Sequence, residues 1–183
     1  LVEQLIRQIM NDVYVEVFYF DEIHEINFNC KTTRISFLKS YDFSDFDLIH
    51  THMLRGDLYY YFHKNKINKP AISTIHQYIW PSLKFSYNWI TASMFTKLWK
   101  IGLSKHAMLV CINKHMRDLY KNEGVNKNID YVYNGVNPVK FYPIDNEDEE
   151  LLNGLKDKFK LLMSISRLNK QKGINEVIPF SVD

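Results

Sequence analysis

The segment of this sequence best equipped for chemistry is the basic stretch from Ser164 to Gly173, S-I-S-R-L-N-K-Q-K-G. A predicted strand delivers Arg167, and Lys170 and Lys172 follow in a loop before Gly173 opens a predicted helix. Unpaired N–H groups at a helix N-terminus attract anions, and arginine and lysine side chains add strong phosphate contacts. The segment therefore predicts a diphosphate-binding loop. A solvated basic loop is the alternative that these residues leave open.

A second segment, Tyr131–Pro143, has the sequence Y-V-Y-N-G-V-N-P-V-K-F-Y-P and predicts a hinge between two domains. Asn134 and Gly135 accept positive φ at little steric cost, so they predict a turn. Pro138 and Pro143 fix φ and keep the residues before them extended. The acidic run at 145–150 that follows is a change of composition of the kind expected at a domain boundary.

Together, the two segments resemble the motifs of family 4 of the nucleotide-sugar glycosyltransferases. The family pattern is N-G-V-D-x-x-x-F-x-P, followed at the head of the second domain by G-R-L-x-x-x-K-G. In this sequence Asn137 stands where Asp is usual, and Ser166 stands where Gly is commonest. Enzymes of this family have the GT-B fold, in which two Rossmann-like domains face each other across a cleft.

The resemblance implies a retaining transfer of a sugar from a nucleotide-sugar donor to a glycan or a lipid-linked acceptor, with no metal or other cofactor. It implies that Arg167 and Lys172 hold the donor diphosphate and stabilise the leaving group. It also implies that Asn134, Gly135 and Gly173 contribute to substrate binding. The expected setting is the cytoplasmic synthesis of a surface polysaccharide or glycolipid.

Predicted strands alternate with predicted helices, which is typical of βαβ units and a parallel sheet. We expect an α/β fold, a Rossmann-like parallel sheet flanked by helices that forms the N-terminal half of a GT-B fold, with a truncated second domain. The expected boundaries are an acceptor-side domain at 1–133 lacking its first strand, a linker at 134–147 and the beginning of a donor-binding domain at 148–183. The expected strands are 13–20, 32–38, 47–50, 70–76, 107–112, 129–133 and 160–165, and the expected helices are 1–10, 56–66, 81–102, 113–124, 148–159 and 173–178.

Two family features are expected to lie outside this sequence. A Gly-rich loop would precede Leu1, and a Glu-(seven residues)-Glu motif that binds the donor would follow Gly173. We therefore expect the chain to be an incomplete fragment that is inactive alone.

Histidines gather where two predicted strands end. In parallel sheets ligands bind beyond the carboxyl ends of the strands, which selects His50, His52, His76 and Gln77. The resemblance places the His of T-I-H, His76, near the transferred sugar, and the alternative is a histidine that caps its own strand. Alternation puts His50 and His52 on one face, where they would line the cleft. A zinc site with His63 and His76 is a weaker alternative, because no carboxylate or cysteine completes it.

Residues 78–106 hold the three tryptophans of the chain and several lysines, with no Asp or Glu. Spacing predicts one core stripe in this stretch, with aromatic residues on the opposite face. Basic helices with Trp favour membrane interfaces, so residues 80–105 are a hypothesis for contact with the inner membrane leaflet. A helix buried on both sides is the alternative. The predicted core stripe consists of Leu83, Tyr87, Ile90, Met94, Leu98 and Ile101.

The composition of the chain limits the remaining classes of function. A net charge of +2 over 183 residues argues against bulk nucleic-acid binding. Cys30 and Cys111 are far apart without ligand spacing, so we expect free thiols in a reducing, cytoplasmic setting. Two rivals to the transferase stay open: a non-catalytic membrane- or partner-binding remnant of the same fold, and a GT-B sugar-nucleotide epimerase, whose acid/base carboxylates are not evident.

Overall fold

The computed structural model describes residues 2–22, 28–135 and 145–156, together with Ser166, Lys172, Gly173 and Glu176. The chain divides between Asn134 and Gly135 into two units. The predicted strand at 160–165 and Arg167 lie outside the described residues. The proposed domain boundaries therefore stay a prediction.

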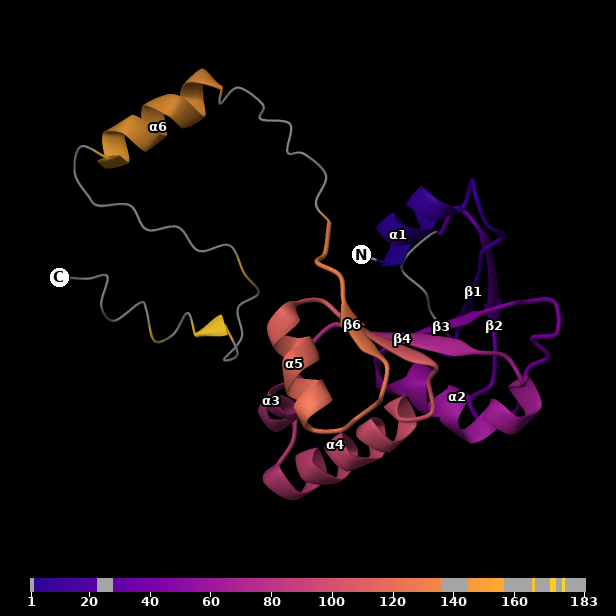
Figure 1. The fold of residues 1–183 in the computed structure, drawn as a ribbon. Coiled ribbons are helices and arrows are strands. Elements are labelled where there is room, and N and C mark those ends of the chain that lie inside the picture. Colours follow the sequence, from indigo (N-terminus) through magenta and orange to yellow (C-terminus); the bar gives the residue numbers. More distant parts are fainter. Residues whose placement is uncertain are drawn as a thin grey trace. The chain divides into compact units, whose positions relative to one another are not determined.

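The first unit is an α/β structure built on parallel strands, which confirms the predicted fold class (Figure 1). β1 (Glu16–Tyr19) and β2 (Lys31–Arg34) form a two-stranded parallel sheet. A four-stranded parallel sheet follows in the order β3 (Ile49–His52), β4 (Ala71–Ile75), β5 (Met108–Cys111) and β6 (Ile129–Tyr131). The helices of this unit are α1 (Val2–Ile9), α2 (Met53–Ile67), α3 (Ile79–Ser86), α4 (Trp89–Leu103) and α5 (Lys114–Asn122), and the second unit contains α6 (Asn146–Lys156).

Two hydrophobic cores hold the first unit together. In one, Ile75 and Leu109 of the four-stranded sheet pack with residues of α3, α4 and α5, including Trp99 and Tyr120. In the other, α2 packs against an aromatic cluster that surrounds Phe43. Figure 1 shows α3 and α5 toward the β6 edge, with β1 and β2 beyond the β3 edge. The four-stranded sheet and α2 thus join the two cores.

Local signals in the sequence locate several helix ends. The Asn113 side chain accepts a hydrogen bond from the backbone N–H of Met116 at 2.8 Å, as expected for the cap of α5. Gly124 has a φ of +64° just after α5, so it supplies the left-handed residue that stops this helix. Asn68 has the same role after α2, with a φ of 47°.

The prediction of one helix over 81–102 is wrong, because the stretch forms α3 and α4 with a break at Tyr87 and Asn88. The Asn88 side chain accepts a hydrogen bond from the backbone N–H of Thr91 at 2.9 Å, which starts a new helix. Tyr87 adopts extended backbone angles and ends α3. An asparagine in a helical pattern can therefore act as a cap and divide the pattern.

The predicted core stripe is also wrong over most of its length. Leu83 is buried, but Ile90, Met94 and Ile101 are about half exposed or more. The face of α4 that enters the core instead consists of Ala92, Thr96, Trp99, Gly102 and Leu103. Small residues let α4 approach α2 closely, because a Cβ on Gly102 would lie 3.1 Å from Leu58 Cδ2. Close packing at Gly102 and the buried indole of Trp99 therefore decide which face of α4 enters the core, and the most hydrophobic face stays outside.

Candidate functional site

The carboxyl ends of β3 and β4 bring three of the predicted histidines together. β3 covers Ile49–His52, two residues later than the sequence suggests, so His50 and His52 lie within the strand. In the parallel register His52 is opposite Thr74. His76 follows β4 at once and lies two residues beyond Thr74, on the same side by alternation. We call His50, His52 and His76 the histidine cluster.

Short contacts connect the histidine cluster. His52 Nδ1 lies 2.9 Å from His76 Nε2, and the two rings stack with centroids 5.2 Å apart. The rings of His50 and His52 are 4.3 Å apart, as the alternation predicts for side chains on one face. His50 Nε2 lies 2.8 Å from Thr74 Oγ1, within hydrogen-bond distance. The result is a row of polar ring atoms along the carboxyl edge of two neighbouring strands.

The environment keeps the histidine cluster uncharged at neutral pH. Burial, followed by repulsion from His50 and His76, lowers the pKa of His52 to about 3. Burial of the ring lowers the pKa of His50 although part of that residue is open to solvent, and it also lowers the pKa of His76. A neutral imidazole has one N–H donor and one acceptor nitrogen, so the cluster can both donate to hydroxyl groups and accept from them.

The free energy of unfolding should fall in acid because of this cluster. The unfolded chain binds protons below the ordinary histidine pKa of about 6.5, whereas folded His52 resists protonation until about pH 3. Stability from His52 is therefore fully present above about pH 6.5 and is lost as the pH falls toward 3. Urea unfolding at several pH values should show a weaker pH dependence in His52→Asn than in the original chain. Identical slopes in the two proteins would contradict the assignment.

A buried polar network lies on the face of β3 opposite the histidine cluster. Thr51 lies between the two histidines of β3 and its side chain is on the opposite, buried side. Thr51 Oγ1 donates to Asp57 Oδ1 at 2.5 Å and lies 2.9 Å from His106 Nε2. Trp99 Nε1 donates to Asp57 Oδ2 at 2.6 Å. The Asp57 carboxylate therefore joins α2 to β3 and to α4.

Asp57 and His106 are the buried titratable groups of this network. Asp57 is 1% exposed and His106 is 4% exposed, and Asp57 Oδ1 lies 3.6 Å from His106 Nε2. Burial lowers the pKa of His106, and the Asp57 carboxylate opposes that shift. His106 Nδ1 donates to the carbonyl of Gly102 at 3.2 Å. Every polar atom named here has a partner, as buried polar groups require.

This network was not predicted from the sequence, although one signal for it is present. Asp57 stands directly before Leu58, Tyr59 and Tyr60, all of which are buried on α2. A carboxylate beside a run of core residues needs donors inside the protein, because an unpaired buried charge is costly. Met53 is a second unpredicted feature: its φ is +65°, and it connects β3 to α2 without a loop. Left-handed backbone at a bulky residue stores strain, which often occurs near functional sites.

The remaining predicted site residues lie elsewhere. Gln77 follows His76, and its carbonyl lies 3.4 Å from the hydroxyl of Tyr120. Asn134 and Gly135 are exposed on the two sides of the division between the units. Gly173 has a φ of +66°, a conformation that favours glycine, and Lys172 directly precedes it. Their roles in substrate binding stay a prediction, and Arg167 lies outside the described residues.

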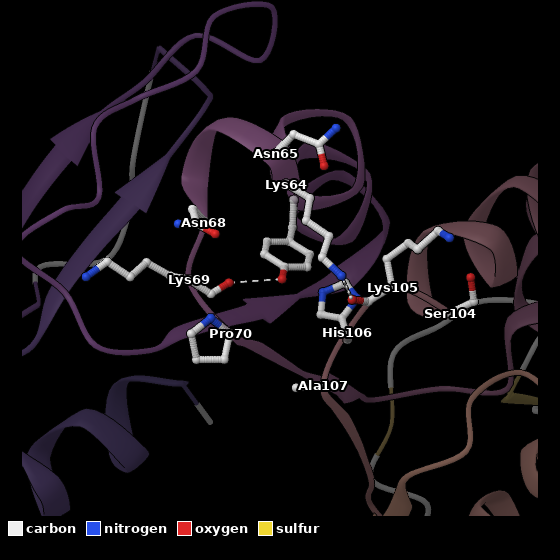
Figure 2. Close-up of a pocket in the computed structure, with 10 residues that line it drawn as sticks. Lys64, Asn65, Asn68, Lys69, Pro70, Ser104, Lys105, His106 and Ala107 are labelled. Carbon is white, nitrogen blue, oxygen red and sulfur yellow. Dashed lines mark hydrogen bonds between the residues drawn. The ribbon is translucent and has the colours of Figure 1, made fainter.

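A cavity of about 800 Å³ is present at the opposite end of the strands (Figure 2). It lies where β4 and β5 begin, and Lys64, Lys69 and Lys105 line it. Lys64 Nζ donates to the carbonyl of Lys105 at 3.1 Å, as Figure 2 shows. Ligands of parallel α/β sheets bind at the carboxyl ends of strands. The histidine cluster is therefore the better candidate site, although it is not part of this cavity.

The described residues contain neither a group of metal ligands nor a helix that could span a membrane. Within that part of the chain, no three side chains of His, Cys, Asp or Glu are grouped to hold a metal ion. His63, considered with the cluster for zinc, instead lies 2.9 Å from the carbonyl of Phe37 through Nε2. Over the same ranges, no helix has the length and apolar character needed to cross a bilayer.

Comparison with known proteins agrees with the fold and with the family resemblance. The family model described as Glycosyltransferase Family 4 matches residues 13–140. Two curated relatives from Escherichia coli, both named O-antigen biosynthesis glycosyltransferase WclY, are 26% identical over 194 residues, which cover 95% of this chain. The chain spans about half the length of these relatives, 51% in each case. On the strength of the family match, the chain belongs to glycosyltransferase family 4.

Proposed function

We propose that this protein transfers a sugar from a nucleotide-sugar donor to a glycan or lipid-linked acceptor, with retention of the anomeric configuration and without a metal cofactor. The observation behind the proposal is the histidine cluster at the carboxyl ends of β3 and β4, in a chain of this family. The relatives are named for O-antigen biosynthesis, which suggests surface polysaccharide as the product class. The cytoplasm is the setting that we propose for this synthesis.

The histidine cluster suits the recognition of a sugar. Sugar hydroxyls both donate and accept hydrogen bonds, and neutral imidazoles can match either need. His52 fixes His76 through Nε2, so Nδ1 of His76 is the nitrogen left for a substrate hydroxyl. Thr74 holds His50 in the same manner. A ring with a fixed orientation loses little entropy when it binds substrate, which favours precise positioning of the reacting atoms.

The donor side of the proposal rests on the resemblance of Ser164–Gly173 to the family motif. Arg167 and Lys172 would bind the diphosphate and stabilise the negative charge that develops as the glycosidic bond breaks. Gly173 would let the backbone turn beside the phosphates, and its φ of +66° is consistent with such a turn. Asn134 and Gly135 would contribute polar backbone and side-chain groups at the boundary between the two units.

A different class of function, a non-catalytic remnant that binds a membrane or a partner, competes with this proposal. The fold alone does not decide between them, because one fold supports many functions. The two differ in turnover, since a remnant would bind without converting any nucleotide sugar. The epimerase alternative would convert a nucleotide sugar into its epimer without any acceptor.

The test uses protein expressed from the entire reading frame with a panel of nucleotide sugars. We expect the release of a nucleoside diphosphate with one or a few donors, undiminished by EDTA. Proton NMR of the transferred product should show the same anomeric configuration as the donor. No turnover with any donor would favour the remnant, inverted products would exclude retention, and a new sugar nucleotide without acceptor would favour the epimerase.

A further inference from the structure

The side of α4 that faces away from the core is apolar. Four side chains of α4 are well exposed: Trp89 at 66%, Ile90 at 74%, Met94 at 57% and Ile101 at 48%. Ile90, Met94 and Ile101 are spaced four and seven residues apart, so they form one stripe along the helix. We call these four residues the α4 outer face. An apolar stripe of this kind on the outside of a protein usually serves for binding.

The apolar surface continues from α4 onto the end of α3. Phe85 is 60% exposed and Tyr87 is 49% exposed, and both precede α4 directly. A shallow hollow of about 360 Å³ is lined by Trp89, Ile90, Ser93, Met94 and Lys97. Large aromatic side chains thus gather at one end of the α4 outer face. Tryptophan and tyrosine are enriched where apolar lipid meets water, because one end of each side chain is polar.

The charged side chains of α3 and α4 are all lysines. Lys84, Lys97 and Lys105 are exposed. The sequence from Tyr78 to His106 contains no Asp or Glu. Among the described residues, the ion pair recorded for this stretch joins Lys100 to Glu123 at 2.9 Å. The α4 outer face is therefore flanked by lysines whose charge is not balanced by carboxylates of their own helices.

We propose that the α4 outer face binds the surface of a bilayer that contains anionic lipids. α4 has 15 residues and is about 22 Å long, so it would lie along the surface with its apolar stripe among the upper acyl chains. The lysines would extend their ammonium groups to the lipid phosphates while their methylene chains cover apolar surface. The proposal does not depend on glycosyl transfer and would hold for a non-catalytic protein as well.

The positive charge near the α4 outer face favours an anionic bilayer over a second copy of the chain. A second copy of the chain would bring lysines against lysines across a symmetric contact, which is unfavourable. An anionic bilayer supplies both an apolar layer and a phosphate layer, which together match the composition of the face. Each lysine near such a surface contributes about 1 kcal/mol, or about fivefold in the partition coefficient.

The test is co-sedimentation of the full chain with vesicles, without any nucleotide sugar. Vesicles of phosphatidylglycerol and phosphatidylcholine should bind the chain, binding should weaken as salt rises, and pure phosphatidylcholine should bind it far less. Replacing Ile90, Met94 and Ile101 together by glutamine should abolish binding. The matched control replaces Leu38, Leu48 and Phe62, which are exposed apolar residues on other parts of the unit, and should bind normally.

A second pair of variants tests the charges. Replacing Lys84, Lys97 and Lys105 by glutamine should weaken binding about 100-fold, at about fivefold per lysine. Replacing Lys66, Lys114 and Lys127 removes the same charge from other exposed positions and should have a much smaller effect. The proposal is overturned by an original chain that ignores anionic vesicles, or by control variants that lose binding equally. A dimer that the Ile90, Met94 and Ile101 variant abolishes would also overturn it, in favour of self-association.

Discussion

Replacing Asp57 by alanine is expected to lower the free energy of unfolding by about 2–6 kcal/mol, at about 1–3 kcal/mol for each of the two buried donors that lose their acceptor. The carboxylate is 1% exposed and accepts hydrogen bonds from Thr51 and Trp99. Alanine would leave both donors without their partner and would remove the carboxylate oxygen that lies 3.6 Å from His106 Nε2. It would also open a cavity between α2, β3 and α4.

Urea unfolding followed by tryptophan fluorescence suits this measurement, because Trp80, Trp89 and Trp99 all lie in α3 and α4. Asp57→Asn retains the shape and one acceptor oxygen, so it should cost less than alanine and provides a folded variant. Asp118→Ala removes an exposed carboxylate paired with Arg117 and should cost about 0–1 kcal/mol. A cost below 1 kcal/mol for Asp57→Ala would show that the network contributes little.

Replacing His76 by asparagine should lower kcat/KM for sugar transfer by about 100-fold or more in the enzyme made from the entire reading frame. The expectation rests on the proposed function and on the size of effects from positioned groups that stabilise charge or transfer protons. The measurement is the initial rate of nucleoside diphosphate release at saturating acceptor. His52→Asn should have a smaller effect, because His52 acts through its hydrogen bond to His76.

His63→Asn is the matched control for this experiment. His63 is also a partly buried histidine, but its ring contacts the carbonyl of Phe37 and the ring of Tyr59, away from the cluster. It should retain the activity of the original enzyme. An unchanged kcat/KM in His76→Asn would remove His76 from the site and leave it as a residue that closes the end of β4.

Features that depend on neighbouring residues were predictable from the sequence. Asn113 and Gly124 gave the ends of α5 correctly, because a cap and a left-handed stop need only a few adjacent positions. The alternation in β3 likewise placed His50 and His52 on one face. The pairing of His52 with His76 spans 24 residues, so it depends on a strand register that local patterns do not contain.

The errors over 81–102 have a similar origin. A prediction from hydrophobic spacing treats all apolar residues alike, and it therefore placed Ile90 and Met94 on the core face of the helix. The actual rotation of α4 follows from the bond between Trp99 and Asp57, which are 42 residues apart, and from the lack of a side chain at Gly102. Long-range polar contacts of this kind override a simple apolar stripe.

Alternate residues of β3 belong to the protein interior and to the candidate site. Thr51 is tied to the buried network, while His50 and His52 on either side belong to the cluster. An insertion or deletion of one residue within this strand would move the histidines into the core and the threonine into the site. The number of residues in β3 is therefore as constrained as their types. The strand can accept substitutions, but a shift of one position would disrupt the core and the site together.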